Sequence, residues 1–509
     1  MSEESQRETI AFLSGLGARA GDQTPPISTH ISRIFFAGDT VYKLKRAVQT
    51  SYLDFSTPER RLAACEKELE LNRRTAPALY KRVRRITRTA EGLELDGAGE
   101  QVDAAVEMSR FDQACLFDRM AQRGALTARH IESLAGNIAA FHRSAEISAV
   151  HGGAAAIGRI LETNEAELRA SFLVHERNVA TACAAMRAAL EANSKLLDAR
   201  RAAGKVRRCH GDLTLRNIAL IGGEPTPFDC LEFDESLATI DVLYDLAFTL
   251  MDLWHRARAD LANMLFNRYL DAMEETDGLP LLPLFIAMRA IIRAHVTARM
   301  SQDYGGDTGE AMKAEARAYF QLAVEAMRGG APVLVGVGGL SGSGKSTVAA
   351  ALAPLMAPMP GARILSSDRI RKALFGAAPT DRLPAEAYAP DVSARVYAQA
   401  RDRAGACLDA QWPVVCDAVF DRAADRAALR KIAAARHLTF HGFWLEASGE
   451  TLAARVAART GDPSDATVDV LRAQQTKLAQ SGESIEWLRL DASRPADKTA
   501  RRIRDALGD

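Results

Sequence analysis

A short segment of the chain combines glycines, a lysine and a hydroxyl residue at fixed spacing. Residues 339–346 read Gly-Leu-Ser-Gly-Ser-Gly-Lys-Ser and fit the pattern G-x-x-x-x-G-K-[ST] at every fixed position. Glycines let backbone N–H groups curl around phosphate oxygens, and a following helix adds the positive end of its dipole. Because an apolar run precedes the segment and an alanine-rich run follows it, a phosphate-binding loop is favoured over a chance glycine-rich turn. The residues predicted to hold phosphate are Gly339, Ser341, Gly342, Ser343, Gly344, Lys345, Ser346 and Thr347, with Lys345 at the outer phosphates and Ser346 also a Mg²⁺ ligand.

Two acidic residues follow the next predicted strands. Asp368 comes directly after the strand expected at 363–366, and Asp417 ends the apolar run 413–417. In an open α/β sheet, ligands bind beyond the carboxyl ends of the strands. Asp368 is therefore a candidate base for an acceptor hydroxyl, Arg371 a candidate to hold phosphate or acceptor, and Asp417 a candidate Mg²⁺ ligand. The alternatives are a helix N-cap with a surface arginine for the first pair and a strand-end cap for Asp417.

Two arginines are spaced four residues apart on a helix predicted before a Gly/Pro-containing segment. Arg455 and Arg459 would lie on one face of that helix, and the segment 460–465 reads Thr-Gly-Asp-Pro-Ser-Asp. This arrangement suits a lid that closes over a phosphoryl group during its transfer. The alternative is a solvated arginine face.

A second constellation lies in the first half of the chain. Residues 210–217 read His-Gly-Asp-Leu-Thr-Leu-Arg-Asn and fit H-x-D-x-x-x-x-N, the spacing of a kinase catalytic loop. That chemistry needs a base at the acceptor hydroxyl, here Asp212, and an amide oxygen on a metal, here Asn217. A second metal ligand is needed shortly afterwards, and Asp229 is at the expected place.

The strand predicted at 40–45 carries a candidate ATP-binding lysine. Lys43 and Lys45 point the same way by strand alternation, and we favour Lys43. Its ion-pair partner is expected on the helix predicted at 57–76, as Glu66 or Glu68, with Glu68 preferred. A solvated Lys/Glu surface is the alternative. No glycine-rich loop precedes this strand, which weakens the prediction that this half binds ATP tightly.

The predicted elements around these residues change character near residue 330. Before it, a few strands lead into long helical patterns; after it, strands and helices alternate, as in a parallel α/β sheet. We therefore predict two domains, 1–328 and 329–509. The first is expected to be α+β, and the second α/β with a parallel sheet and helices on both faces.

Composition excludes several classes of protein. The 509 residues are 48% hydrophobic and 26% charged, and 65 Lys+Arg balance 65 Asp+Glu. These values exclude a disordered chain, and zero net charge argues against nucleic acid or an anionic membrane as partner. Seven scattered cysteines without a C-x-x-C pair argue against a disulfide framework. The polar start and apolar runs shorter than a membrane span predict a cytoplasmic protein.

The motifs carry two resemblances. Residues 333–507 resemble the small P-loop kinases, such as gluconate kinases, shikimate kinases and zeta toxins. Residues 25–300 resemble the aminoglycoside phosphotransferase and choline kinase branch of the protein-kinase-like fold, which writes His-Gly-Asp in its catalytic loop. This second resemblance implies that His210 is structural and that Asp245 braces the loop. The whole layout resembles a bacterial two-domain family described as bifunctional aminoglycoside phosphotransferase and ATP-binding (AAA-type) proteins.

These features predict an ATP- and Mg²⁺-dependent phosphotransferase that phosphorylates a hydroxyl of a small molecule and has a second kinase-like site. Three alternatives remain open. In the first, the N-terminal half is a non-catalytic recognition or regulatory module. In the second, the protein is a nucleic-acid end kinase. In the third, it is a nucleotide-driven switch without an acceptor. The acceptor, the choice between ATP and GTP, and the oligomeric state do not follow from the sequence.

Overall fold

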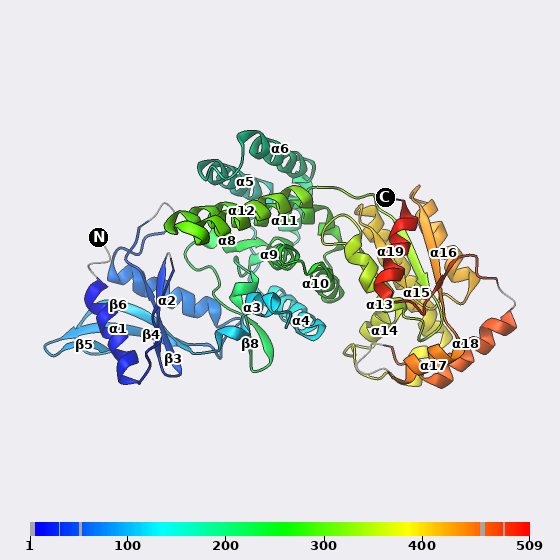
Figure 1. The fold of residues 1–509 in the computed structure, drawn as a ribbon, viewed down its shortest axis with the longest axis horizontal. Coiled ribbons are helices and arrows are strands. Elements are labelled where there is room, and N and C mark those ends of the chain that lie inside the picture. Colours follow the sequence, from blue (N-terminus) through cyan, green and yellow to red (C-terminus); the bar gives the residue numbers. More distant parts are fainter. Residues whose placement is uncertain (1–5, 30, 50–52, 459–463, 482–483, 509) are drawn as a thin grey trace. The chain divides into compact units, whose positions relative to one another are not determined.

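The computed structural model describes residues 6–29, 31–49, 53–458, 464–481 and 484–508 (Figure 1). The chain forms two compact units, one of Met1–Glu162 with Ser194–Arg256, the other of Thr163–Asn193 with Ala257–Asp509. The second unit thus groups helices from before residue 329 with the C-terminal sheet. The domain boundary at 328 stays a prediction.

The first unit contains a six-stranded antiparallel sheet in the order β1-β2-β3-β6-β4-β5. One face packs on α1 through Leu13 and Leu44, and the other packs on α2 through Val41 and Cys65. Helix α2 starts after Thr57, whose hydroxyl accepts from a backbone N–H one turn on. The strands are β1 (Ile27–Ser28), β2 (Ser32–Ala37), β3 (Thr40–Lys45), β4 (Tyr80–Thr89), β5 (Gly92–Leu95) and β6 (Glu100–Ser109), with helices α1 (Arg7–Arg19) and α2 (Pro58–Asn72).

The remainder of the first unit positions the loop at 210–217. Two short antiparallel pairs, β7 with β10 and β8 with β9, flank this loop. Asp241 caps α9 and forms a buried ion pair with Arg200, at 2.8 Å between Oδ2 and Nε. The elements are α3 (Phe117–Gln122), α4 (Ala128–Ser144), α7 (Ser194–Ala202), β7 (Val206–Arg208), β8 (Ile218–Ile221), β9 (Glu224–Pro227), α8 (Glu235–Ala238), β10 (Thr239–Asp241) and α9 (Val242–His255); α5 (Gly153–Ala170) spans the division between the units.

The second unit contains a five-stranded parallel sheet in the order β12-β13-β11-β14-β15. Helices α13 and α19 pack on one face, where Val337, Val348 and Ile503 belong to one buried cluster. Helices α15 and α16 lie against the other face. This confirms the predicted α/β class with helices on both faces. The strands are β11 (Leu334–Gly338), β12 (Arg363–Ser366), β13 (Val414–Asp417), β14 (Phe440–Glu446) and β15 (Leu488–Asp491).

The helices of the second unit fall into two groups. Those that precede the parallel sheet in the sequence are α6 (Glu176–Ala192), α10 (Ala259–Ala272), α11 (Leu282–Met300) and α12 (Gly306–Ala326). Those around the sheet are α13 (Lys345–Leu352), α14 (Ser367–Leu374), α15 (Pro390–Asp409), α16 (Ala423–Ala434), α17 (Gly449–Ala457), α18 (Val468–Ser481) and α19 (Ala496–Leu507). Within the described part of the chain, one helical stretch, Thr276–Asp303, is long and apolar enough to cross a membrane, and 67% of its most apolar window is buried inside the protein.

Helix α10 covers the outer strand of the parallel sheet. The side-chain amide of Asn267 accepts from the N–H of Ile364 at 2.7 Å and donates to the carbonyl oxygen of Ala362 at 3.2 Å. One turn further, Asp271 accepts from Arg363 at 2.6 Å and from Arg369 at 2.9 Å. An edge strand offers unpaired backbone groups, and here α10 supplies their partners.

Replacing Asn267 by alanine should destabilise the second unit. Asn267 is fully buried, so its loss leaves the N–H of Ile364 without this partner, at an expected cost of about 1–3 kcal/mol. Urea unfolding followed by circular dichroism measures the effect. Asn178 on α6 is exposed, and Asn178→Ala serves as the control, with no expected change. Equal stability of the two variants would contradict a stabilising role for Asn267.

Candidate active sites

The phosphate loop predicted at 339–346 joins β11 to α13. Its glycines have backbone angles that other residues rarely adopt, with φ of 145° at Gly339, 84° at Gly342 and 83° at Gly344. Gly342 is also crowded, because a Cβ atom there would lie 2.5 Å from the carbonyl oxygen of Leu452. Helix α13 begins at Lys345, directly after the left-handed Gly344. The sequence pattern thus identified the backbone geometry as well as the residues.

Lys345, Ser346 and Asp417 meet at the start of α13. The hydroxyl of Ser346 donates to Oδ2 of Asp417 at 2.6 Å, and Nζ of Lys345 donates to the carbonyl oxygen of Leu340 at 3.1 Å. Burial raises the pKa of Asp417, while Lys345 and Ser346 oppose that rise. A hydroxyl and a carboxylate side by side form a donor set of the kind that Mg²⁺ prefers. The residues present therefore fit the predicted metal.

Asp368 and Arg371 lie on α14, which begins where β12 ends. After burial, the charge of Asp368 is a further cause of the raised pKa of Asp417, because it lies near that carboxyl. Arg371 is buried; it donates to the carbonyl oxygen of Ala387 at 2.5 Å and its guanidinium lies 4.8 Å from the ring centre of Tyr388. The predicted contact of Arg371 with phosphate or acceptor stays a prediction.

The predicted arginine pair is only partly described. Arg455 is half-buried on α17, three residues after Leu452, whose carbonyl crowds the phosphate loop at Gly342. Arg455 thus belongs to a helix that packs against the loop. Arg459 lies outside the described residues. The role of both arginines in charge neutralisation stays a prediction.

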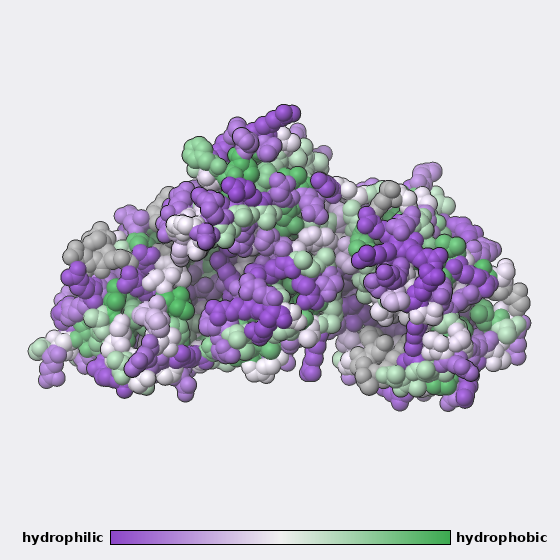
Figure 2. Space-filling view, in the orientation of Figure 1, coloured by the Kyte–Doolittle hydropathy of each residue, from purple (hydrophilic) through white to green (hydrophobic). Residues whose placement is uncertain are grey.

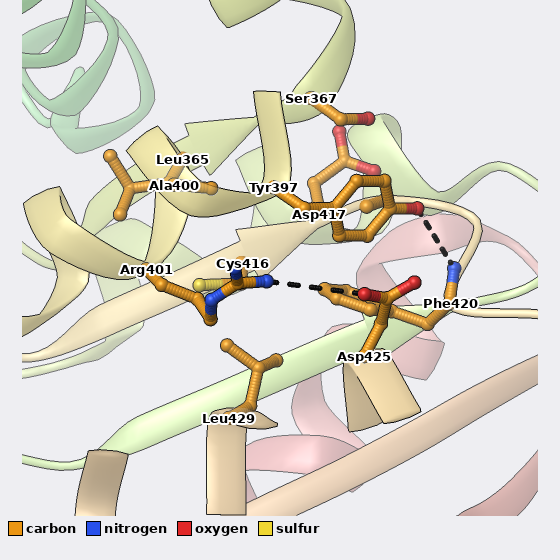
Figure 3. Close-up of a pocket in the computed structure, with 11 residues that line it drawn as sticks. Leu365, Ser367, Tyr397, Ala400, Arg401, Cys416, Asp417, Phe420, Asp425 and Leu429 are labelled. Atoms are coloured by element: carbon orange, nitrogen blue, oxygen red, sulfur yellow. Dashed lines mark hydrogen bonds and ion pairs between the residues drawn. The ribbon is translucent and has the colours of Figure 1, made fainter. Parts of the chain in front are cut away.

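A pocket opens beside Asp417 at the carboxyl ends of β12 and β13 (Figure 3). Its polar groups include Ser367, Arg401 and Asp425, and burial raises the pKa of Asp425. The ion pair between Arg401 and Asp425 is long, at 3.9 Å. The rest of the wall is mostly apolar and is formed by Leu365, Tyr397, Ala400, Cys416, Ala418, Phe420 and Leu429. The pocket therefore shares Asp417 with the phosphate loop.

Gln474 on α18 contacts the phosphate loop, although no sequence motif indicated it. Its Oε1 accepts from the backbone N–H of Ser341 at 3.0 Å. Leu340, the preceding loop residue, packs against an apolar cluster that includes Leu452 on α17 and Leu471 on α18. Ser341 and Gln474 are 133 positions apart in the chain, so only the folded structure brings them together.

In the first unit, Lys43, Glu68 and Asp229 converge, and Lys43 pairs with Glu68 on the helix where its partner was expected. Nζ of Lys43 donates to Oε1 of Glu68 at 2.7 Å and also to the carboxylate of Asp229. Glu68 is fully buried, whereas the alternative Glu66 is exposed. Asp229 has a left-handed φ of 63°. Burial would raise its pKa, but Lys43 and other cationic neighbours outweigh this and lower the pKa of Asp229 to about 2.

Lys45, the other lysine of β3, forms ion pairs with Glu68 and Glu232. It is fully buried, contacts Oε2 of Glu68 at 2.5 Å and pairs with Glu232, three residues after Asp229. The side chain of Lys43 remains 11% exposed, so Lys43 is the lysine with access to a ligand. Strand alternation alone did not separate the two lysines, and the pairing of Lys45 with Glu232 was not predicted.

In the catalytic-loop motif, Asn217 and Asp212 contact each other directly. Nδ2 of Asn217 donates to the backbone oxygen of Asp212 at 2.9 Å and to its Oδ2 at 2.8 Å. This fixes the amide with its nitrogen on Asp212, which leaves Oδ1 as the end that suits a metal. Arg216 adds a hydrogen bond to the same carboxylate at 3.2 Å. Asp229 and Asn217 thus provide oxygen donors that fit the predicted metal ligands.

Asp245 braces this loop, as the resemblance implied. Its two carboxylate oxygens accept from the N–H groups of His210 at 3.0 Å and Gly211 at 2.8 Å. Nε2 of His210 lies 3.0 Å from the carbonyl oxygen of Phe228. His142 and Cys209 complete a fully buried group around Asp245. The carboxylate of Asp245 therefore holds the backbone at the start of the catalytic loop.

Family models match both halves of the chain. Residues 34–279 match the model described as "Phosphotransferase enzyme family", and residues 333–480 match the one described as "AAA domain". The chain joins a phosphotransferase-family domain to a P-loop kinase domain. These domains make the protein an ATP-dependent phosphotransferase, and they confirm the resemblance that the motifs indicated.

Relatives of this phosphotransferase align with it over nearly its whole length. Uncharacterized proteins of Mycobacterium tuberculosis and Mycobacterium bovis are 28% identical over 489 residues, which cover 92% of this chain and 93% of theirs. Among solved structures, a gluconokinase from Sinorhizobium meliloti 1021 is 24% identical and covers 35% of this chain and 97% of its own, with a TM-score of 0.24. A choline kinase from Cryptosporidium parvum Iowa II is 10% identical and covers 59% of this chain and 88% of its own, with a TM-score of 0.38.

Proposed function

We propose that the C-terminal half of this phosphotransferase transfers the terminal phosphoryl group of Mg·ATP to a hydroxyl of a small molecule bound at the carboxyl ends of β12 and β13, where the pocket beside Asp417 opens. The observation that carries this proposal is the position of Asp417. It accepts a hydrogen bond from Ser346 of the phosphate loop and also lines the pocket. A donor site and an acceptor site therefore meet at one carboxylate.

In this reaction the acceptor oxygen attacks the terminal phosphorus, the bond from that phosphorus to the bridging oxygen breaks, and ADP leaves. Asp368 takes the proton of the acceptor hydroxyl. Lys345 and Arg455 offset the charge that develops on the transferring group. Ser346 and Asp417 would hold Mg²⁺, which would neutralise phosphate charge when bound. Most of the rate enhancement comes from positioning and electrostatics, because phosphoryl transfer needs little covalent chemistry from the protein.

The N-terminal half is proposed as a second Mg·ATP site. Lys43 would bind phosphate, Asn217 and Asp229 would hold the metal, and Asp212 would be the base. The fixed Asn217 amide and the Lys43–Glu68 pair support this role. The competing interpretation, a recognition module without catalysis, draws on the absence of a glycine-rich loop before β3.

The ion pairs formed by the basic run 81–88 favour a small-molecule acceptor over nucleic acid. On β4, Arg82 and Arg84 pair with Glu107, and Arg88 pairs with Glu8. These arginines are therefore neutralised within the protein. Nucleic-acid binding of the electrostatic kind needs uncompensated basic residues along a groove.

Calorimetric titration with Mg·ATP tests the two-site proposal. Two equivalents should bind to the wild type, one of them lost in Lys345→Ala and the other in Asp229→Ala. A single equivalent, lost only in Lys345→Ala, would leave the N-terminal half as a recognition module. ATP hydrolysis that is unaffected by Asp368→Ala and yields no phosphorylated product would instead favour a nucleotide-driven switch.

A further inference from the structure

The contact between Gln474 and Ser341 lies on the phosphate loop, at a peptide group that Lys345 also contacts. Lys345, which this class of loop directs to the β- and γ-phosphate oxygens, donates to the carbonyl oxygen of Leu340 at 3.1 Å. Leu340 directly precedes Ser341, whose N–H is bound by Gln474. The ammonium of Lys345 and the amide of Gln474 therefore contact the two ends of one peptide group, the one that joins Leu340 to Ser341.

The orientation of the Gln474 amide is set by this contact. A glutamine amide offers one oxygen acceptor and an NH₂ group with two donors. The oxygen is used by Ser341, so the NH₂ end is the part that remains to meet a phosphate oxygen at the mouth of the loop. A donor to a charged phosphate oxygen forms a charge-assisted hydrogen bond, which is stronger than a neutral one.

Helix α18 is held at the phosphate loop by more than this amide. Leu471, one turn before Gln474, packs with Leu340 of the loop and with Leu452 of α17. One turn after Gln474, Lys477 donates to Asp421 at 2.7 Å, in the segment that follows β13. Three successive turns of α18 are thus fixed beside the loop and beside the segment that leads to the acceptor pocket.

We propose that Gln474 selects nucleoside triphosphate over diphosphate: its carbonyl oxygen holds Ser341 in place while its NH₂ group donates to the terminal phosphate. This inference rests on the proposed function of the C-terminal site. A diphosphate lacks the outermost phosphate, so it gains little from the NH₂ group. Gln474 thereby links the presence of a transferable phosphoryl group to the contact between α18 and the phosphate loop.

Two substitutions separate this role from simple support of the loop. Gln474→Ala removes both the acceptor and the donors, whereas Gln474→Glu keeps an oxygen for Ser341 but has no donor and adds a negative charge. The dissociation constants of a non-hydrolysable ATP analogue and of ADP are measured by calorimetry on the full chain carrying Asp229→Ala, so that binding reports the C-terminal site. Gln475→Ala is the matched control, because Gln475 is the neighbouring residue of the same helix, with its Nε2 near Gly449 on α17 rather than on the phosphate loop.

We expect Gln474→Ala to weaken the analogue about tenfold and ADP less than twofold, the size expected for one hydrogen bond to a charged group. Gln474→Glu should weaken the analogue at least as much, and Gln475→Ala should change neither ligand. Equal losses for both ligands, or recovery of analogue binding in Gln474→Glu, would show a loop-supporting role and overturn this proposal alone. If no binding depends on Lys345, the proposed function fails as well.

Discussion

Lys345→Ala is expected to lower kcat/KM for ATP turnover in the C-terminal half by about 10³-fold or more, the range seen when a preorganised charge at a phosphoryl transition state is lost. The side chain lies across the first half of the phosphate loop, at 3.1 Å from the carbonyl oxygen of Leu340. Its removal takes away the cation that faces the outer phosphates and leaves the loop glycines unchanged.

The measurement is steady-state ATP hydrolysis in chains that also carry Asp229→Ala, so that turnover at the N-terminal half does not contribute. Lys498→Ala is the control, because Lys498 is exposed on α19 and its loss should leave the rate unchanged. Thermal unfolding should be similar for both variants. Turnover that persists in Lys345→Ala would mean that the phosphate loop is not the site of the reaction.

Asp212→Asn is expected to lower turnover in the N-terminal half by about 10²- to 10⁴-fold, the usual contribution of a general base. The substitution keeps the size of the side chain and an oxygen that accepts from Asn217, which donates at 2.8 Å in the wild type. It removes the group that takes the proton from the attacking hydroxyl or water. Mg·ATP binding should change little, because Lys43, Asn217 and Asp229 remain.

This effect is measured as ATP hydrolysis in the Lys345→Ala chain, in which only the N-terminal half can turn over. Asp260→Asn is the control, since Asp260 lies on the surface of α10 with its side chain 59% exposed. Loss of hydrolysis together with loss of Mg·ATP binding would assign Asp212 a structural role. If the Lys345→Ala chain shows no hydrolysis at all, the N-terminal half is not a catalytic site for water as acceptor.

The two predicted loops share one property in the structure: their contacts are local. The phosphate loop and the catalytic loop are continuous segments whose backbone geometry depends on their own glycines and on hydrogen bonds within a few residues. Asn217 reaches Asp212 across five positions, so a fixed spacing predicts the contact. The same holds for the strand-end position of Asp417, which follows directly from an apolar run.

Contacts between distant segments could not be predicted in this way. Alternation places Lys43 and Lys45 on the same face of β3, and only the packing of α2 and the segment after Asp229 decides which lysine is buried. Gln474 is one of several polar residues on α18, and its sequence neighbourhood carries no glycine or charge pattern. The contact of Arg371 with the carbonyl oxygen of Ala387 is another that its position in the sequence did not indicate.

Because α10 covers the outer strand β12, the point at which the chain is truncated should affect how the C-terminal fragment behaves. A fragment that starts at residue 329 would lack Asn267 and Asp271, and the backbone groups of Ala362 and Ile364 would face water. Such a bare strand edge is a template for pairing with a second copy, so we expect this fragment to self-associate. A fragment that starts at residue 257 retains α10 over this strand edge, and it should self-associate less at the same concentration.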